Sequence, residues 1–329
     1  MGKDVEALSK IARRYERFAM TEARGSSPIY ERLALAVAGS PELLAFLRSL
    51  PDERRQPNLF LAAIRHAGGV PSGGHAMEEI VRGQASRIRD LMLSRTTQTN
   101  EPARCSILLP ALAGLNQPLA LIEVGASAGL CLVPDRYGYD YGRHCIEPSP
   151  PAPAGAPVFQ CIASAATPLP PAPPNVGWRY GLDLNPLDVK SPADMEWLET
   201  LIWPGQEHRA QRLRAAIEIA RADPPPVHRG NLLTDLPAVA ALSPKGMRLV
   251  VYHSAVLGYV RSHADREAFA NTVRQSGAVW ISNEAQAVFP QLMGAAPPPP
   301  TPGHFLLAVD GKPVAWTGPH GQSIDWFAS

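Results

Sequence analysis

Hydrophobic residues in the first part of the chain recur at steps of three and four residues, which is the spacing of one helical face. Leu8, Ile11, Tyr15 and Phe18 follow this spacing. Ser40-Pro41 adds a helix N-cap followed by proline at the first helical position. The predicted helices cover residues 29–37, 41–50, 58–67, 77–95 and 101–115. We therefore predict an α-helical N-terminal (cap) domain over residues 1–117.

The pattern changes at Pro118. Leu119–Val124 is a short apolar run without alternation, which is typical of a strand buried on both faces of a parallel sheet. Similar runs lie at 178–182, 248–252 and 278–282, with helical stretches at 194–202, 206–221 and 266–276. Phe305–Val309 and Pro313–Trp316 flank Asp310-Gly311, a strong hairpin signal. Residues 118–329 are therefore predicted to form an α/β domain whose mostly parallel sheet ends in an antiparallel hairpin.

Composition fits a globular protein and narrows the range of partners. The chain has 329 residues, of which 45% are hydrophobic and 19% charged, and a formal net charge of +1. So small a charge gives no support for nucleic acid or an anionic membrane as partner. No segment approaches the ~18 apolar residues of a membrane span, and Met1–Glu6 leads into charged residues rather than an apolar signal core. We expect a cytoplasmic protein with a small-molecule partner, and the oligomeric state stays open.

Proline and cysteine add two local expectations. The 35 prolines cluster, and two of the clusters fall within residues 131–176, which we interpret as an insertion that walls a pocket. The four cysteines are Cys105, Cys131, Cys145 and Cys161. They form no CxxC pair and no histidine pattern accompanies them, so we expect no metal site. Reduced, partly buried thiols are the expected state.

A glycine loop, Glu123-Val124-Gly125-Ala126-Ser127-Ala128-Gly129, follows the first buried strand. Glycine allows a sharp turn and lets a ligand approach the backbone. The dinucleotide fingerprint GxGxxG needs glycines at 125, 127 and 130, where Ser127 and Leu130 break it. The loop resembles instead the acidic-x-Gly-x-Gly-x-Gly pattern of class I methyltransferases, which bind S-adenosylmethionine (SAM). That pattern is met at Glu123, Gly125 and Gly129 and departs at Ser127.

Two further segments predict cofactor contacts. Gly181–Pro186 resembles the Gly-x-Asp-x-Ser-Pro segment of the same superfamily, and a carboxylate at Asp183 can accept hydrogen bonds from both ribose hydroxyls. The alternative is a turn or cap carboxylate. Asn231 resembles the position that contacts adenine, against the alternative of an ordinary turn asparagine.

Polar residues at later strand ends are candidates for the chemistry, because ligands in open α/β sheets lie outside the carboxyl ends of strands. The candidate bases are His253, Glu284 and His320, and a histidine near its reference pKa works at neutral pH. Ser254 and Asn283 beside them are predicted to line the substrate pocket. The alternatives are a satisfied histidine under a loop for His253 and a helix cap for Glu284.

Residues just before the first strand are predicted to reach the same pocket. Arg104 is a candidate for the methionine carboxylate of SAM. Asn100 and Glu101 are candidate pocket residues, with helix capping as the alternative for Asn100. Tyr139, in the insertion, either stacks on an acceptor or packs the insertion, and packing is favoured.

The chain resembles, nearly end to end, a bacterial family of uncharacterised proteins assigned a class I SAM-dependent methyltransferase-like Rossmann fold. The resemblance implies that fold and supplies no established reaction. It rests on residues 98–101, 121–130, 135–137, 139–142, 181–188, 203–204, 253–257, 282–284 and 319–321.

These observations favour a SAM-dependent methyltransferase acting on an unknown small-molecule acceptor. The alternative is a non-catalytic SAM- or nucleoside-binding or interaction protein on the same fold, suggested by Ser127 in the loop. A nicotinamide oxidoreductase is disfavoured by the glycine spacing.

Overall fold

The structure, a computed structural model, describes residues 2–149 and 155–328. The chain divides into two compact units. Unit 1 contains Met1–Thr99 and Glu196–Gln211, and unit 2 contains Asn100–Met195 and Arg212–Ser329. The predicted boundary lay between residues 117 and 118. The division differs from it because residues 100–117 belong to unit 2 and residues 196–211 to unit 1.

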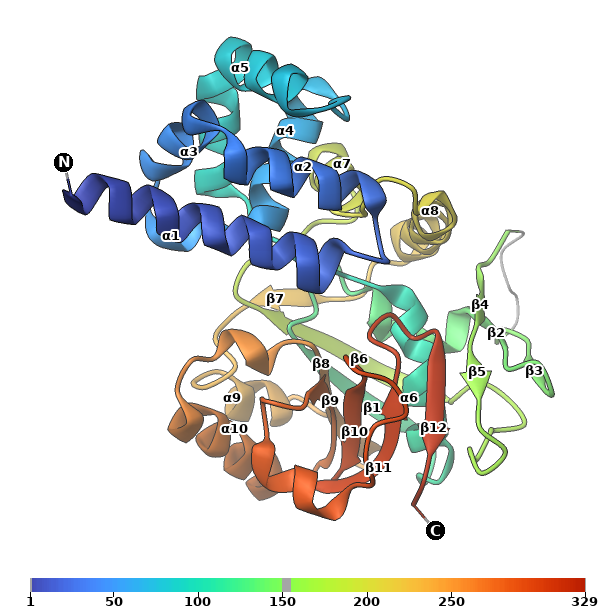
Figure 1. Cartoon of the computed structure of the whole chain (residues 1–329). Helices are drawn as coiled ribbons and strands as arrows, with labels where there is room; N and C mark the ends of the chain where they lie inside the picture. The colour runs from blue at the N-terminus through green and yellow to red at the C-terminus, as the bar shows by residue number, and fades with distance from the viewer. Residues whose placement is uncertain (1, 150–154, 329) are drawn as a thin grey trace. The chain divides into compact units, whose positions relative to one another are not determined.

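Unit 1 is helical (Figure 1). Its elements are α1 (Gly2–Phe18), the π-helix η1 (Ala19–Ala23), α2 (Pro28–Gly39), α3 (Pro41–Arg48), the 3-10 helix η2 (Asp52–Arg54), α4 (Pro57–Gly68) and α5 (Gly74–Ser94). The Ser27 and Ser40 hydroxyls cap α2 and α3 by accepting backbone N–H bonds, with proline next in each helix. The predicted cap at Ser40-Pro41 is confirmed, because a cap oxygen satisfies an N–H that the first turn leaves unpaired.

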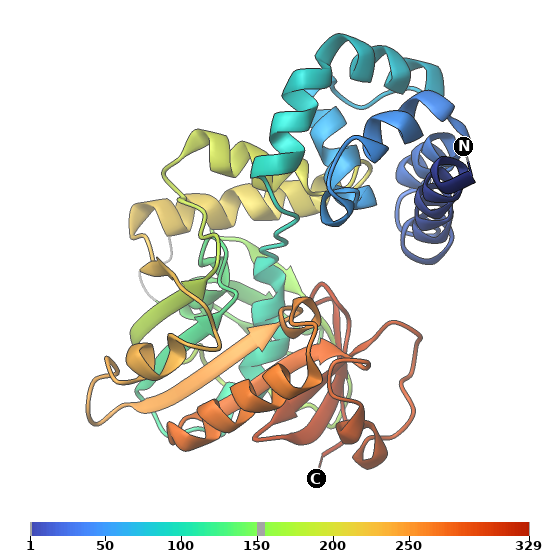
Figure 2. The same cartoon turned by 90° about the vertical axis from the view of Figure 1, so that its left-hand side faces the viewer.

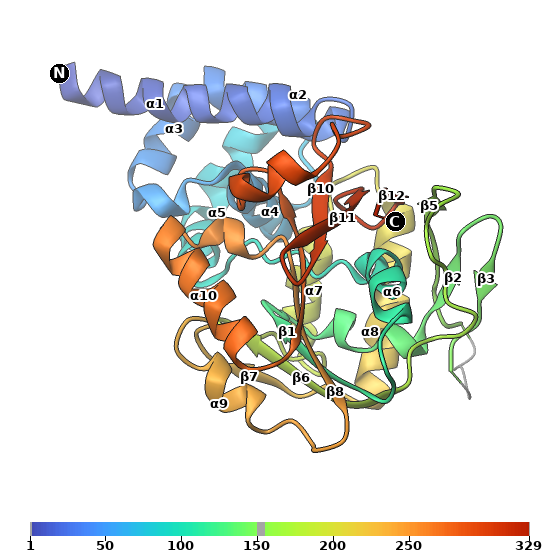
Figure 3. The same ribbon diagram turned by 90° about the horizontal axis from the view of Figure 1, so that it is seen from below.

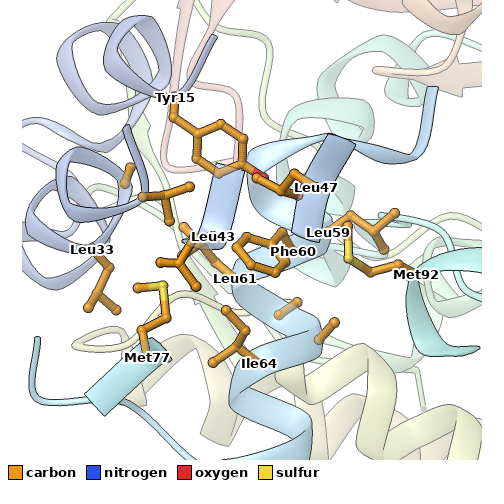
Figure 4. Close-up of a cluster of buried hydrophobic side chains, with 14 of the residues drawn as sticks. Tyr15, Leu33, Leu43, Leu47, Leu59, Phe60, Leu61, Ile64, Met77 and Met92 are labelled. Atoms are coloured by element: carbon orange, nitrogen blue, oxygen red, sulfur yellow. The ribbon is translucent and has the colours of Figure 1, made fainter. Parts of the chain in front are cut away.

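The helices of unit 1 share one apolar core (Figure 4). The Tyr15 and Phe60 rings meet edge to face with centroids 6.2 Å apart. Trp197 is 1% exposed in the same core, and its Nε1 donates to the Thr96 carbonyl at 3.0 Å. This burial explains why residues 196–211 belong to unit 1 although they lie far along the chain.

Unit 2 is a mixed α/β structure around a nine-stranded sheet of order β5-β12-β11-β10-β9-β8-β1-β6-β7. The five strands from β7 to β9 are parallel, the pairs β9–β10, β10–β11 and β11–β12 are antiparallel, and β5 pairs in parallel with β12 at the edge. The predicted mostly parallel sheet and terminal hairpin are confirmed. The strands are β1 (Leu119–Val124), β5 (Ile162–Ala163), β6 (Val176–Asp183), β7 (Val227–Arg229), β8 (Arg248–Ser254), β9 (Val279–Ala285), β10 (Phe305–Val309), β11 (Lys312–Thr317) and β12 (Ser323–Trp326).

Helices cover both faces of this sheet. α9 (Leu236–Ala240) and α10 (His263–Gln275) lie on one face and α6 (Cys105–Ala113) on the other (Figure 1 and Figure 3). α10 runs along the strands, as Figure 2 shows. Phe269 and Val273 of α10 share one buried apolar cluster with Ile122 and Trp280 of the sheet, so α10 is held on this face by apolar packing.

The remaining elements connect or extend these layers. α7 (Pro192–Thr200) and α8 (Glu207–Ala222) each begin in one unit and end in the other. The predicted insertion carries the 3-10 helices η4 (Leu130–Leu132) and η5 (Pro134–Arg136) and a small sheet of order β3-β2-β4, formed by Cys145–Ile146, Gly138–Asp140 and Val158–Gln160. Two more 3-10 helices are η6 (Leu257–Tyr259) and η7 (Pro290–Ala295). No helix in the described residues is long and apolar enough to cross a membrane.

Residues 100–117 belong to unit 2, contrary to the predicted boundary. The 3-10 helix η3 (Pro102–Arg104) leads into α6, which is buried from Cys105 to Leu112. A helix apolar on all sides has to be enclosed. At Gly321, which has φ +79°, an added Cβ would lie 2.1 Å from the Ala103 carbonyl oxygen. The Ser106 hydroxyl donates to the Gly321 carbonyl at 2.8 Å, so η3 and α6 are fixed to the turn before β12.

We predict that Tyr15→Phe stabilises unit 1. The Tyr15 hydroxyl is buried with no hydrogen-bond partner among the described residues, and such a group costs about 1–3 kcal/mol. Chemical denaturation should show a higher free energy of unfolding. Tyr137→Phe is the control of opposite sign, because the Tyr137 hydroxyl donates to the Leu130 carbonyl at 2.7 Å. A destabilised Tyr15→Phe variant would contradict the prediction.

We predict that Gly321→Ala destabilises unit 2 far more than Gly303→Ala does. Both glycines have positive φ, but an added Cβ at Gly303 meets nothing within 4 Å. The control therefore carries only the left-handed backbone cost of about 1–2 kcal/mol, and the contact with Ala103 adds about 2 kcal/mol or more at position 321. Urea denaturation of both variants measures the difference, and equal losses would show that the turn moves away from η3 without cost.

Candidate functional site

The glycine loop lies at the carboxyl end of the central strand of unit 2. β1 pairs in parallel with β6 on one side and β8 on the other. Numbered as they occur in the chain, the five parallel strands have the order 3-2-1-4-5. The order reverses between β1 and β8, and in open α/β sheets a ligand crevice lies outside the carboxyl ends at such a point.

The glycines of this loop are required by conformation and packing. Gly125 and Gly129 both have φ +73°, which L side chains rarely adopt. A Cβ at Gly125 would lie 2.4 Å from the Val256 side chain, and one at Gly129 would lie 2.8 Å from Pro225. The loop after β1 is therefore in close contact with the loop after β8.

Two side-chain oxygens of the loop are buried without partners. Glu123 Oε2 and Ser127 Oγ make no hydrogen bond to any described residue. Burial raises the pKa of the Glu123 carboxyl well above its usual value, and nearby Cys131 and Asp183 add to the rise while Arg104 opposes it. A buried acid next to a second carboxylate is the kind of group found at functional sites.

Asp183, at the end of β6, holds the glycine loop in place. One carboxylate oxygen accepts the Ser127 N–H at 2.8 Å and the other accepts the Asn185 N–H at 2.7 Å. Asp183 is therefore the turn carboxylate of the alternative reading, and it also holds the glycine loop, while its contact with a ribose stays a prediction. Ser127 has φ +53°, and its N–H bond to Asp183 helps to stabilise that conformation.

Asn231 is an exposed turn residue. Its side-chain carbonyl accepts the Leu233 N–H at 2.9 Å, and its own N–H donates to Asp235 at 2.8 Å. The structure thus gives Asn231 the ordinary turn role that was the alternative to an adenine contact.

Residues of η3 reach the same edge of the sheet. Arg104 is 7% exposed; its Nε donates to the Pro319 carbonyl at 2.9 Å and its Nη1 to the Ser254 carbonyl at 3.1 Å. Glu101 is buried and caps η3 through the Ala103 N–H. His320 Nδ1 lies 4.0 Å from Glu101 Oε2, with 44% of the histidine side chain exposed.

Three further predicted residues have structural bonds at this edge. The Asn100 side-chain oxygen accepts the Leu130 N–H at 3.0 Å, just after the glycine loop. The Asn283 amide donates to the Ser254 hydroxyl at 2.8 Å and accepts from the Thr317 hydroxyl at 2.6 Å. Asn283 is fully buried, whereas Ser254 is partly exposed. Ser254 is therefore the member of this group that a ligand can reach.

His253 and Glu284 do not fit the predicted role of free bases. β8 and β9 extend past the predicted strand ends, so both residues lie inside strands and are buried. His253 Nδ1 lies 2.7 Å from Glu284 Oε1, and His253 Nε2 accepts from Trp280 Nε1 at 3.0 Å. His253 has no ring nitrogen left for a substrate, and it packs against Phe269 of α10, on the face opposite to Glu123.

Tyr139, a candidate pocket residue, has the packing role that the sequence favoured over stacking on an acceptor. It is fully buried, and its hydroxyl donates to the Pro134 carbonyl at 2.6 Å. Its ring lies 6.4 Å from that of Tyr141. A phenol enclosed in this way fills the small sheet of the insertion and is closed to an acceptor.

The comparison with protein families covers almost the whole chain. A family model described as "Uncharacterized protein conserved in bacteria (DUF2332)" matches residues 12–326. The chain belongs to this family. The predicted membership of an uncharacterised bacterial family is thereby confirmed. Searches of curated proteins and of solved structures found no match.

In this DUF2332 chain, the sequence pattern missed several residues of the site. Cys131 donates to the Glu101 carbonyl at 3.3 Å, and Tyr252 donates to the Cys131 carbonyl at 2.8 Å. The Val256 side chain lies against Gly125, and Trp280 Nε1 donates to His253 Nε2. All four are apolar or weakly polar, and no spacing signal separates them from core residues. The four cysteines are free thiols and three of them are buried, as predicted.

A surface hollow of about 400 Å³ lies elsewhere in unit 2 of this DUF2332 chain. It is bordered by α10, η7 and the hairpin turn, and none of the predicted site residues lines it. Its position does not bear on the loop after β1, where the buried unpaired oxygens lie.

We predict that Glu123→Gln stabilises this DUF2332 protein in a pH-dependent way. Because the folded pKa of Glu123 is raised, its stabilising contribution is present below the ordinary pKa near 4.5 and is lost as pH rises through the folded pKa. Glutamine has no such loss, so the difference in unfolding free energy should be near zero in acid and positive at neutral and alkaline pH. Thermal unfolding across this range measures the difference.

The control is Asp325→Asn on β12, where the carboxylate is exposed. This variant shows how far the loss of a surface carboxylate by itself changes the free energy of unfolding. A Glu123→Gln difference that is flat, or that falls with pH, would show that Glu123 is ionised without cost in the folded protein.

Proposed function

We propose that unit 2 binds SAM at the carboxyl ends of β1 and β6 and transfers its methyl group to a small-molecule acceptor. The observation that carries the proposal is the pair of buried, unpartnered oxygens, Glu123 Oε2 and Ser127 Oγ, on one glycine loop. Each costs about 1–3 kcal/mol while it stays unsatisfied. A ligand that supplies hydrogen-bond partners to both atoms would recover this cost.

The charges around the loop fit SAM, which carries a sulfonium, an ammonium and a carboxylate. Glu123 and Asp183 contribute carboxyls, and Arg104 is close enough to lower the pKa of Glu123. Asp183 would hold the ribose hydroxyls, since each carboxylate oxygen has two lone pairs. Glu123 would hold the ammonium group and Arg104 the carboxylate. Asn231 would act toward adenine only through its side-chain N–H group, because its carbonyl is used within its turn.

The topology of unit 2 also supports the proposal. Five parallel strands of order 3-2-1-4-5 continue into the antiparallel pair β10–β11. The hairpin turn has φ +50° at Asp310 and +76° at Gly311, as a two-residue turn of positive φ requires. We assign unit 2 to the Rossmann-like class I methyltransferase type on this combination of sheet and loop.

The chemistry left to the protein is modest. SAM, when bound, supplies an electrophilic methyl group, so the chain has to align the acceptor and, where needed, remove a proton. His320 is the best placed of the three predicted bases, because it is partly exposed and has Glu101 behind it at 4.0 Å. A carboxylate at that distance stabilises the imidazolium that forms when the ring accepts a proton.

The direct test is calorimetric titration with SAM and S-adenosylhomocysteine. We expect micromolar binding, of about −7 to −8 kcal/mol, that Asp183→Ala weakens at least tenfold. Asp188→Ala is the matched control, since it removes the same charge from an exposed aspartate on the same loop. Glu123→Gln should bind more weakly although it is the more stable protein, so its loss of affinity cannot come from unfolding. Absence of heat with both ligands in the wild-type protein would refute the proposal.

One observation favours a second candidate, a SAM- or nucleoside-binding protein without catalysis. Val256 occupies the space that a Cβ at Gly125 would need, so packing alone accounts for that glycine. Incubation with labelled SAM and a small-molecule extract separates the two functions. Methylated product that His320→Asn abolishes supports the enzyme, whereas SAM binding without any product supports the second candidate.

A further inference from the structure

One oxygen of Glu284 gathers three hydrogen bonds inside unit 2. Glu284 Oε1 lies 2.7 Å from His253 Nδ1 and accepts the backbone N–H groups of Val256 at 2.9 Å and Leu257 at 3.1 Å. Glu284 is 3% exposed. The side chain therefore links the interior of β9 to the loop that follows β8.

The partners of His253 fix its protonation pattern. An indole N–H only donates, so His253 Nε2 accepts from Trp280 and the ring proton lies on Nδ1, which donates to Glu284. Trp280 is itself held by α10 and by the residue before η7, since Arg274 of α10 lies over its ring at 5.5 Å and Phe289 meets it edge to face at 5.6 Å. His253 thus holds the Glu284 carboxylate in one orientation.

The loop held by Glu284 contacts the glycine loop. Ala255 has φ +58°, an uncommon backbone conformation for a residue with a side chain. The two amides that Glu284 accepts come directly after it, and the first belongs to Val256, whose side chain lies against Gly125. The bonds to Glu284 oppose the return of this segment to an ordinary conformation.

We propose that Glu284 is a positioning residue, which with His253 and Trp280 holds Val256 against the glycine loop and thereby shapes the ligand site beside Glu123 and Asp183. The part of this inference that concerns SAM rests on the proposed function. The holding of the loop stands on the hydrogen bonds alone. Holding the loop requires an acceptor oxygen at the end of a side chain as long as that of glutamate, because all three groups that contact Glu284 Oε1 are N–H donors.

Two conservative variants separate the effect of side-chain length at position 284 from the effect of its negative charge. Glu284→Gln keeps an acceptor oxygen at the same length and removes the charge. Glu284→Asp keeps the charge and withdraws the carboxylate by one methylene. Ser282→Ala is the control, since Ser282 is buried on the same strand, and the hydrogen bonds of the described residues join the loop amides to Glu284 rather than to Ser282. Hydrogen exchange at Val256 and Leu257 and the Kd for SAM are measured for each, at a fixed interval below its own melting temperature.

Glu284→Asp should speed exchange at both amides at least tenfold and weaken SAM binding at least tenfold. Glu284→Gln and Ser282→Ala should stay within about threefold of the wild-type protein on both readouts. The inference would be overturned if Glu284→Asp kept slow amide exchange while Glu284→Gln lost it. It would also be overturned if exchange at Val256 and Leu257 accelerated in neither variant. If the wild-type protein binds no SAM, the proposed function fails, and the exchange measurements still decide whether Glu284 holds the loop.

Discussion

The contact between Val256 and Gly125 sets the geometry on which the candidate site depends. The strand order reverses between β1 and β8, where an open sheet usually leaves a crevice. Here a Cβ on Gly125 would come within 2.4 Å of Val256, so the loops after β1 and β8 close on each other. On the other side of β1, Asp183 of β6 accepts the Ser127 N–H, and Ser127 and Glu123 are the loop residues with unsatisfied side-chain oxygens. The candidate site on this edge therefore comprises the ends of β1 and β6, and the loop after β8 packs against its glycine loop.

The two faces of the sheet divide residues that are neighbours in sequence. Successive side chains of a strand point to opposite faces. Tyr252 therefore shares the face of Glu123, and burial together with the nearby Glu123 carboxyl raises the pKa of the Tyr252 phenol. His253 instead packs with Phe269 under α10. Ser254 returns to the first face, beside Asn283 and Arg104. His253 and Ser254 are adjacent in sequence, but Ser254 lies at the candidate site whereas His253 supports the sheet from the opposite face.

The spacing of hydrophobic residues predicted most of the helices and central strands, but it did not predict which segments pack together in each unit. The helices of unit 1, the buried strands and the Asp310-Gly311 hairpin follow from local spacing and turn chemistry. β7 has three residues, too few for a period to show, and β8 and β9 extend beyond their apolar runs because polar His253, Asn283 and Glu284 are satisfied within the sheet. The placement of residues 100–117 and 196–211 depends on long-range contacts, such as Gly321 with Ala103 and Trp197 with Thr96. No local pattern contains that information.

Buried unpaired oxygens alone do not mark a site, because unit 1 contains them too. Tyr15 and Tyr30 each have a hydroxyl without a hydrogen-bond partner among the described residues. A phenol stays neutral and its cost is bounded by one lost hydrogen bond, so a helical core tolerates it. Glu123 differs because burial, with Cys131 and Asp183 nearby, raises the pKa of its carboxyl against the opposing effect of Arg104, so its ionisation is costly without a compensating cation. Glutamine would avoid that cost in the same volume. The raised pKa of a buried carboxyl at the end of the central strand therefore distinguishes the glycine loop from the unpaired phenols of unit 1.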